Sequence, residues 1–153
     1  MNIYIINASH NGFDWAQLGI QTYIKRIPRF AKLHLLPIKQ QKLGSITVSE
    51  AMRLDAAAIL EKLPKQSHVI LCHETGKQYD SHQFAQMIDK SLLGSSSITF
   101  VIGPAYGLSK EIIKNYPLLS LSKMTLQHEI AELVLYEQIY RALTIINNHP
   151  YHR

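Results

Sequence analysis

Short apolar runs alternate along the chain with longer segments in which apolar residues recur every three to four positions. Compact apolar runs are typical of strands, whereas the longer spacing is typical of one face of a helix. The pattern predicts strands over residues 2–8, 33–38, 68–72, 98–102 and 118–121. It predicts helices over residues 13–27, 47–63, 81–92, 109–115 and 128–146. Because strands and helices alternate, we expect an α/β fold in which helices cover both faces of a mostly parallel sheet.

Local signals mark the ends of two of these helices. Pro28 and Pro64 end the first and second helices, and Thr47 to Glu50 has the spacing of a capping box. In such a box the Thr hydroxyl accepts from a free backbone N–H and the Glu side chain reaches back to another. The apolar residues at helical spacing in the first helix are Trp15, Leu18, Gly19, Tyr23 and Ile27.

Composition narrows the class of protein. The 153 residues fit a single domain, residues 1–153, and shares of 46% hydrophobic and 18% charged residues are those of a globular protein. The opening apolar run, residues 3–6, is too short for a membrane span or a signal peptide, so we expect a cytoplasmic protein. A net charge of +5 favours a polyanionic partner. The lone Cys72 allows no internal disulfide, and the eight histidines show no metal-binding spacing, so we expect no metal site.

Three loops should meet beyond the carboxyl ends of the predicted strands, where ligands bind in such sheets. They are residues 72–76, 103–107 and 121–126. The glycine loop alone is a weak signal, since it matches neither a Rossmann fingerprint nor a P-loop and could be a simple strand-to-helix turn. Together the loops indicate a nucleotide-type cofactor pocket. Its candidate binding residues are Cys72, His73, Gly103, Gly107, Leu121, Ser122, Lys123, Met124, Thr125 and Leu126.

The chain ends in residues suited to RNA contact. Tyr151 offers a ring for stacking, His152 can move a proton near neutral pH, and Arg153 can pair with phosphate. A frayed, inert terminus is the alternative. Glu137 and Arg141 stand four apart on one helix face, either as a surface ion pair or as functional groups. His128 begins the same helix, where it either orders the cofactor loop or takes part in catalysis.

These segments resemble the RlmH family, the pseudouridine N3-methyltransferases of large-subunit ribosomal RNA, within the SPOUT class. The resemblance begins at residues 19–26, continues through Gly76, Lys77 and Ser81, and is strongest from Ile102 onward. It rests there on residues 119–126, His128, residues 137–142, Tyr151 and His152. It implies a homodimer with a C-terminal trefoil knot, a bent S-adenosylmethionine as cofactor, and methylation of a pseudouridine in 23S rRNA on the assembled ribosome.

A sulfonium methyl group is already activated, so the reaction needs alignment of donor and acceptor and removal of one proton, but no metal. The candidate catalytic residues are His128, Glu137, Arg141, Tyr151, His152 and Arg153. A broader basic surface for RNA phosphates is predicted at Lys25, Arg26, Arg29, Lys32, Lys39 and Lys42, with a solvated helix face as the alternative.

The chain departs from the family at two positions. Pro104 stands where the family usually has a second glycine, and it removes a backbone donor from the cofactor loop. Glu132 stands where relatives commonly have arginine, which reverses a charge near the expected RNA face. Two other functions therefore stay open: a catalytically weak relative that binds rRNA, and a small-molecule α/β enzyme whose basic charge is incidental.

Overall fold

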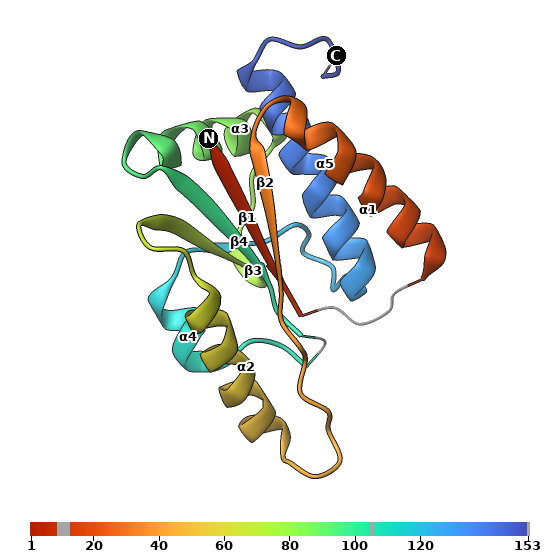
Figure 1. The fold of residues 1–153 in the computed structure, drawn as a ribbon, viewed down its shortest axis with the longest axis vertical. Helices are drawn as coiled ribbons and strands as arrows, with labels where there is room; N and C mark the ends of the chain where they lie inside the picture. The colour runs from red at the N-terminus through yellow and green to blue at the C-terminus, as the bar shows by residue number, and fades with distance from the viewer. Residues whose placement is uncertain (9–12, 105, 153) are drawn as a thin grey trace.

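The computed structural model describes residues 1–8, 13–104 and 106–152, without the side chain of residue 92 (Figure 1). Its strands form one five-stranded sheet in the order β2-β1-β4-β3-β5, and every neighbouring pair is parallel. The strands are β1 (Asn2–Asn7), β2 (Lys32–Pro37), β3 (Ser67–Lys77), β4 (Ser97–Ile102) and β5 (Leu118–Leu119). The predicted parallel sheet is confirmed.

Helices cover both faces of this sheet, as expected for parallel strands joined by crossover connections. The helices are α1 (Asp14–Arg26), the 3-10 turn η1 (Ile27–Arg29), α2 (Val48–Lys62), α3 (Ser81–Leu93), α4 (Lys110–Asn115) and α5 (His128–Ile146). Figure 1 shows α1, α3 and α5 on one face and α2 with α4 on the other. The chain therefore changes face between α4 and α5, so α5 returns beside α1 and α3.

Two apolar layers hold the sheet between the helices. All six residues of β4, the central strand, are buried. Alternate side chains of a strand point to opposite faces. Accordingly, Ile98 and Phe100 pack with α3 and α5, whereas Val101 packs with α2 and α4. Its two polar residues, Ser97 and Thr99, are buried as well, and the Thr99 hydroxyl is hydrogen-bonded to the Ser67 hydroxyl at 2.6 Å.

The face of α1 that packs against the core is not the face that carries its largest apolar residues. Trp15 and Leu18 are 54% and 72% exposed, whereas Ala16 and Ile20 are buried. The small Gly19 faces α5, where an added Cβ would lie 2.8 Å from Leu133 Cδ1. Helical spacing identified the helix, but it could not tell which apolar stripe faces the core.

The predicted capping box at the start of α2 is only half formed. The Thr47 hydroxyl accepts from the Glu50 N–H at 3.2 Å, but the Glu50 carboxylate pairs with Arg53 at 2.7 Å instead of reaching back. A complete box begins α3, where Asp80 and Gln83 exchange bonds of 2.8 and 3.0 Å. The Glu50 carboxylate pairs with Arg53, one turn further along α2, and not with the backbone N–H of Thr47 as a complete capping box requires.

The end of β3 is the largest departure from the predicted strand bounds. Residues 72–76 were expected to form a loop, but β3 continues to Lys77 and pairs with Leu119 at both Cys72 and Lys77. β5 is correspondingly shorter than predicted. Gly76 lies so close to the backbone of β5 that a Cβ there would lie 2.6 Å from the carbonyl carbon of Leu118. The strand extension depends on this long-range contact, which no local pattern contains.

Candidate cofactor cavity and C-terminal polar cluster

A cavity of about 700 Å³ lies beyond the carboxyl ends of β4 and β5 and beside residues 72–74 of β3. The structure brings nine of the ten candidate cofactor residues into its lining; Lys123 is exposed and lies outside it. The nine are Cys72, His73, Gly103, Gly107, Leu121, Ser122, Met124, Thr125 and Leu126. Its volume is within the range of about 300–1,000 Å³ that is usual for small-molecule sites.

The glycine loop is fixed to α2 by a buried carboxylate. Asp55 is 1% exposed and accepts hydrogen bonds from the Tyr106 hydroxyl and, at 3.3 Å, from the Gln41 N–H. Desolvation and then the bond to Asp55 raise the pKa of Tyr106 to about 12, so this phenol stays protonated and donates. The Gly107 N–H closes the turn on the Pro104 carbonyl at 2.9 Å. Sequence reasoning missed Asp55 and Tyr106 because they are separated by 51 residues.

Hydroxyl groups shape the loop after β5. Ser120 donates to the Ser122 carbonyl at 2.8 Å, and the Ser122 hydroxyl accepts from the Met124 N–H at 3.0 Å. These bonds turn the chain around the cavity before α5 begins. The lining also contains two carboxylates, Glu74 and Glu129, which the sequence analysis had not singled out. Acidic groups in such a cavity suit a ligand that carries positive charge.

Cys72 is half-buried in the cavity wall at the β3–β5 contact. Desolvation raises the pKa of its thiol to about 12. The thiol therefore keeps its proton at neutral pH and is no nucleophile, since only the thiolate attacks. Cys72 therefore contributes to the shape of the cavity wall and not to its chemistry.

His128 connects the cavity to the end of β1. Its ring lines the cavity, and its Nε2 lies 3.0 Å from the Asn7 side-chain oxygen. Because that oxygen only accepts, Nε2 carries the proton in this contact. The bond fixes the orientation of the ring and the first turn of α5 relative to the sheet.

Glu132 is not on a surface that RNA could meet, contrary to the expectation from sequence. It is 5% exposed, and among the described residues its Oε2 has no hydrogen-bond partner. Desolvation, together with the nearby Glu129, raises the pKa of Glu132 to about 7, against a lowering by the Asn7 side chain. The residue therefore changes the pH dependence of stability rather than the surface charge.

We expect Glu132→Gln to stabilise the protein more at alkaline than at acidic pH. The folded state holds this proton up to about pH 7, whereas the unfolded state releases it above about pH 4.3, so the parent loses stability between these values. The gain from Glu132→Gln should grow by about 2 kcal/mol between about pH 5 and about pH 8 in urea unfolding. Glu61→Gln, at an exposed position of α2, is the control and should show no such trend. An equal trend in both variants would contradict the assignment.

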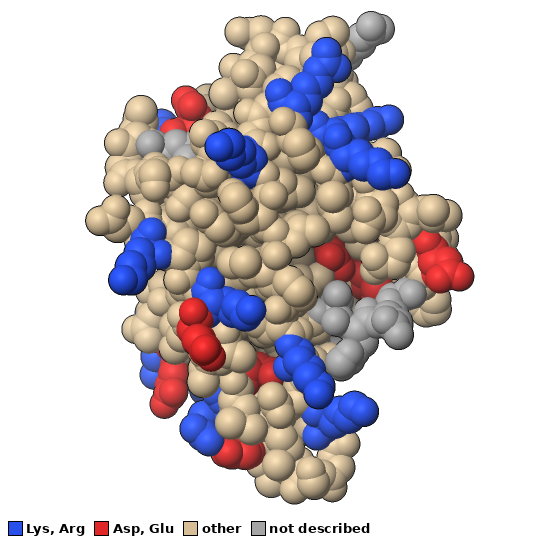
Figure 2. Space-filling view, in the orientation of Figure 1, with Lys and Arg blue, Asp and Glu red and all other residues tan. Residues whose placement is uncertain are grey.

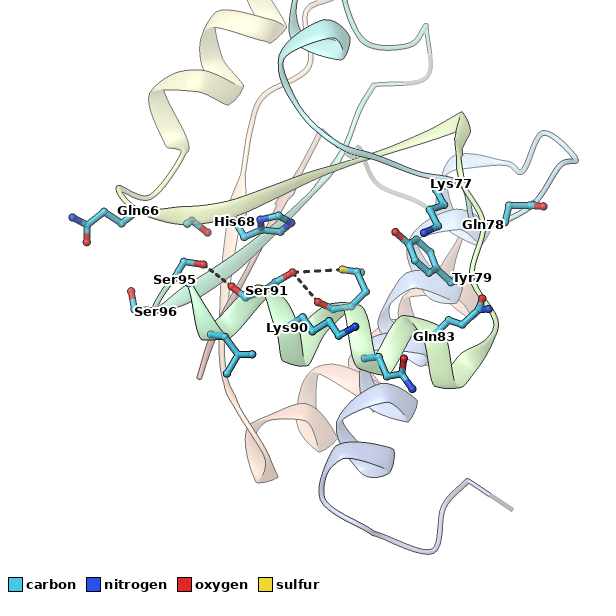
Figure 3. Close-up of a pocket in the computed structure, with 15 residues that line it drawn as sticks. Gln66, His68, Lys77, Gln78, Tyr79, Gln83, Lys90, Ser91, Ser95 and Ser96 are labelled. Carbon is cyan, nitrogen blue, oxygen red and sulfur yellow. Dashed lines mark hydrogen bonds between the residues drawn. The ribbon is translucent and has the colours of Figure 1, made fainter.

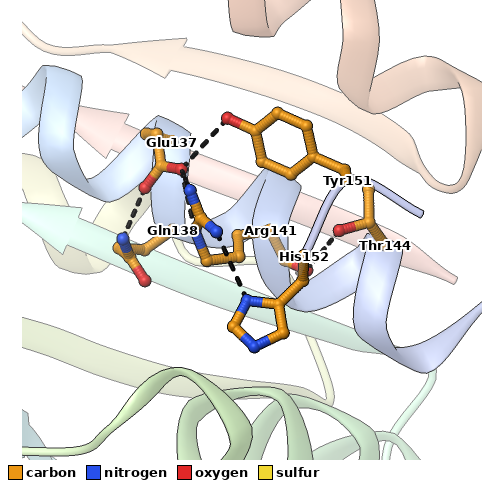
Figure 4. A network of polar contacts seen from close by, with 6 residues as sticks. All are labelled: Glu137, Gln138, Arg141, Thr144, Tyr151 and His152. Carbon is orange, nitrogen blue, oxygen red and sulfur yellow. Dashed lines mark hydrogen bonds and ion pairs between the residues drawn. The ribbon is translucent and has the colours of Figure 1, made fainter. Parts of the chain in front are cut away.

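The C-terminal residues form a polar cluster with the second half of α5 (Figure 4). Glu137 Oε1 accepts from Arg141 Nη2 at 2.7 Å and Nε at 2.9 Å, and from the Tyr151 hydroxyl at 3.2 Å. Arg141 Nη1 donates to His152 Nδ1 at 3.3 Å. The predicted Glu137–Arg141 pair is thus the centre of a half-buried network that holds the tail in place.

Aromatic packing completes this cluster. The Tyr151 ring meets Tyr140 edge-on at 4.8 Å, and the Arg141 guanidinium lies 4.9 Å from the Tyr151 ring centre. Desolvation raises the pKa of Tyr151, and the bond to Glu137 raises the pKa of Arg141, so both stay protonated donors. Arg153, another candidate, lies outside the described residues.

The candidate catalytic residues fall into two groups within one chain. His128 is at the cavity, whereas Glu137 is nine residues further along α5, which corresponds to about 14 Å. Figure 1 shows the C-terminus at the end of α5 away from the cavity loops. One chain alone therefore does not bring the tail to its own cavity.

Basic side chains gather near the tail. Figure 2 shows a group of Lys and Arg over the end of α1 and η1, where Lys25, Arg26 and Arg29 are exposed. Arg26 lies 5.9 Å from the Tyr140 ring centre, so this group adjoins the C-terminal cluster. Lys32, Lys39 and Lys42 are also exposed.

Within the described residues there is no cluster of potential metal ligands. None of the described helices is long and apolar enough to cross a membrane.

Comparison with known proteins shows to which family of proteins this chain belongs. A family model described as predicted SPOUT methyltransferase matches residues 1–152. Two similar proteins, from Janthinobacterium sp. (strain Marseille) and Bacillus cytotoxicus, are 39% and 40% identical over the full length of this chain, and 99% and 100% of their own lengths are covered. Both are named ribosomal RNA large subunit methyltransferase H. The chain therefore belongs to the SPOUT methyltransferases and, within them, to the RlmH family of these relatives.

A solved structure supports the fold. It is described as a crystal structure of an hypothetical protein, and it superposes with a TM-score of 0.56 over 95% of this chain and 68% of its own. At 15% identity it shows the fold alone. The family resemblance inferred from the C-terminal motifs is confirmed by the family model and the two relatives, not by this structure.

Proposed function

We propose that this protein transfers the methyl group of S-adenosylmethionine to N3 of a pseudouridine in 23S rRNA on the assembled ribosome. The observation that carries the proposal is the cavity built by the loops beyond β4 and β5, in a chain of the RlmH family. Relatives named as large-subunit rRNA methyltransferases support the rRNA substrate.

The cavity lining fits this cofactor chemically. Leu121, Leu126 and Met124 offer apolar surface for an adenine ring, and Ser122 and Thr125 offer hydroxyls for a ribose. Glu74 and Glu129 offer negative charge to the sulfonium and amino groups. When bound, the cofactor supplies an activated methyl group. The protein's residues then hold the two reactants in line and provide a path for the N3 proton.

The tail residues divide into donors and proton acceptors. Tyr151 and Arg141 keep their protons at neutral pH, since the ordinary pKa of each is far above 7 and is raised further here. They are suited to hydrogen-bond the target base as negative charge develops on it. The candidates for taking the proton are then Glu137 and His152 in the cluster and His128 at the cavity.

A homodimer would bring the two groups of residues together. The tail of one chain would reach the cavity of its partner, since the distance along α5 keeps it from its own. The exposed apolar residues Phe13, Trp15 and Leu18 support such an interface.

We also propose that the C-terminal half is knotted. The close approach of Gly76 to the backbone of β5, followed by the return of α5 on the face of the sheet opposite α4, supports that threading.

The function is tested with purified protein, S-adenosylmethionine carrying a labelled methyl group, and ribosomes from cells that lack the protein. We expect one labelled pseudouridine in 23S rRNA, identified by mass spectrometry of its nucleosides. A weak rRNA-binding relative would bind ribosomes without transferring label, and a small-molecule enzyme would not sediment with ribosomes. Either result would overturn the proposal.

We expect Gly103→Val to lower S-adenosylmethionine affinity about fivefold, or about 1 kcal/mol. A Cβ at Gly103 would lie 2.7 Å from Leu108 Cγ and Cδ2, so either the buried Leu108 side chain or the loop must move, and both line the cavity. Gly94→Val is the control, because a Cβ there meets nothing within 4 Å. Calorimetry giving the parent affinity for Gly103→Val would remove this loop from the cofactor site.

A further inference from the structure

A second, larger cavity of about 1510 Å³ lies between β3 and α3 (Figure 3). One wall comes from the two ends of β3, where His68 and Lys77 contribute side chains. The other comes from α3, through Gln83, Gln86 and Lys90. This β3–α3 groove is separate from the cofactor cavity, since the two share no lining residue.

The groove exists because β5 covers only part of β3. β5 pairs with β3 at Leu71, Cys72 and Lys77, so within the described chain no strand pairs with residues 67–70 on that side. α3 buries its opposite face, through Phe84, Ala85 and Ile88, against the sheet. The outer stripe of α3 is thus left without a partner beside an unpaired strand edge.

The charged side chains in the described lining of the groove are both positive. Lys77 on β3 and Lys90 on α3 both direct their ammonium groups into the space between the two walls (Figure 3). None of the described lining residues is Asp or Glu. Glutamine and serine side chains make up most of the remaining lining. A polyanion with additional hydrogen-bonding groups matches this surface.

Ring side chains stand among these cations. Tyr79 and His68 are half-buried in the lining, and Lys77 Nζ lies 4.8 Å from the Tyr79 ring centre. Rings beside lysines and amides are the combination that proteins use on unpaired RNA, where bases stack and phosphates meet cations. A bound peptide strand would instead need apolar pockets for alternate side chains. The non-aromatic apolar side chains of the described lining, Met87 and Leu93, both belong to α3 and provide no such series of pockets along β3.

The groove also adjoins the C-terminal polar cluster. His82 in the first turn of α3 packs edge-on against His152 at 4.8 Å between ring centres. An RNA strand at the tail could therefore continue along α3, where Gln83 to Lys90 spans about 10 Å.

We propose that the β3–α3 groove binds a single-stranded segment of ribosomal RNA next to the nucleotide that is methylated. Lys77 and Lys90 would contact phosphates, and Tyr79 would stack on a base. The inference rests on the proposed function, because it takes rRNA to be the substrate.

The test compares two double variants with the same net charge, both as full-length protein. Lys77→Gln with Lys90→Gln neutralises the groove, and Lys110→Gln with Lys114→Gln neutralises two exposed lysines of α4 on the opposite face. Affinity for ribosomes is measured by co-sedimentation at several salt concentrations. The groove variant should bind about fivefold or more weakly, and its salt slope should fall by about 1.4, since each lost contact with a single-stranded phosphate removes about 0.7. The control should stay within about twofold of the parent, and both should bind S-adenosylmethionine like the parent.

Ultraviolet crosslinking on the ribosome gives an independent readout, in which we expect a ribonucleotide attached to the segment 77–90. Equal ribosome affinity and salt slope for the two double variants would overturn the groove proposal. So would crosslinking of this segment to a ribosomal protein. If the parent methylates rRNA while either of these results holds, only the groove assignment fails. If the parent neither binds ribosomes nor transfers methyl groups, the proposed function fails and the groove proposal fails with it.

Discussion

Deleting residues 151–153 should reduce methyl transfer to ribosomes by a factor of ten or more, while S-adenosylmethionine affinity stays within about twofold. The deletion removes the Tyr151 hydroxyl bond to Glu137 and the His152 contact with Arg141. It leaves the cavity lining unchanged, because that lining ends at residue 131. Initial rates and calorimetry must be compared at one salt concentration, since phosphate contacts weaken as salt rises.

A mixed dimer would show which chain's tail acts at which cavity of the proposed homodimer. A tail-deleted chain, carrying an intact cavity, is co-expressed with a Gly103→Val chain, which carries an intact tail. If the tail acts on the partner's cavity, the mixed dimer regains transfer with the parent's dependence on S-adenosylmethionine concentration. If each tail served its own cavity, only the weakened Gly103→Val cavity would have a tail, so the same rate would need about fivefold more S-adenosylmethionine. Full activity of the tail-deleted homodimer would instead make the tail an inert end.

Gly76→Ala should destabilise the protein by about 3 kcal/mol or more. The added Cβ would lie 2.6 Å from the carbonyl carbons of both Leu118 and Leu119 and 2.7 Å from the Leu119 nitrogen. These are backbone atoms, so no side chain can rotate away. β5 would have to separate from β3, and the bond from the Ser120 N–H to the Lys77 carbonyl, 3.0 Å long, would be strained or lost.

Gly94→Ala is the matched control for this substitution. A Cβ at Gly94 has no neighbour within 4 Å, and its φ of −107° suits an L-residue. Its free energy of unfolding in urea should stay within about 0.5 kcal/mol of the parent. Equal stability of the two alanine variants would show that the close contact between β3 and β5 tolerates a side chain at residue 76.

The positions of most strands and helices along the chain could be predicted from local patterns. The alternation of strands and helices predicted the parallel sheet, but the order of its strands was not predicted. The cavity loops could also be anticipated, because the carboxyl ends of parallel strands share one edge. Seven candidate residues in the loops after β4 and β5 line one cavity for this reason, whereas Cys72 and His73 reach it from within β3.

Features that depend on contacts between distant segments could not be predicted. The extension of β3 to Lys77 needs the pairing with Leu119, and the anchoring of the glycine loop needs Asp55 to meet Tyr106. Glu132 has the sequence context of a surface charge, yet the packing of α5 on the sheet buries it.

The sequence by itself determined the strands, the helices and the family, because hydrophobic period and short motifs are local properties of the chain. Only the tertiary structure decided that His128 and the Glu137–Arg141 cluster lie apart along α5, and that Lys77 and Lys90 face one groove. Such distances depend on how rigid helices pack across a sheet. That packing is set by the sum of many long-range contacts, which no single segment of sequence specifies.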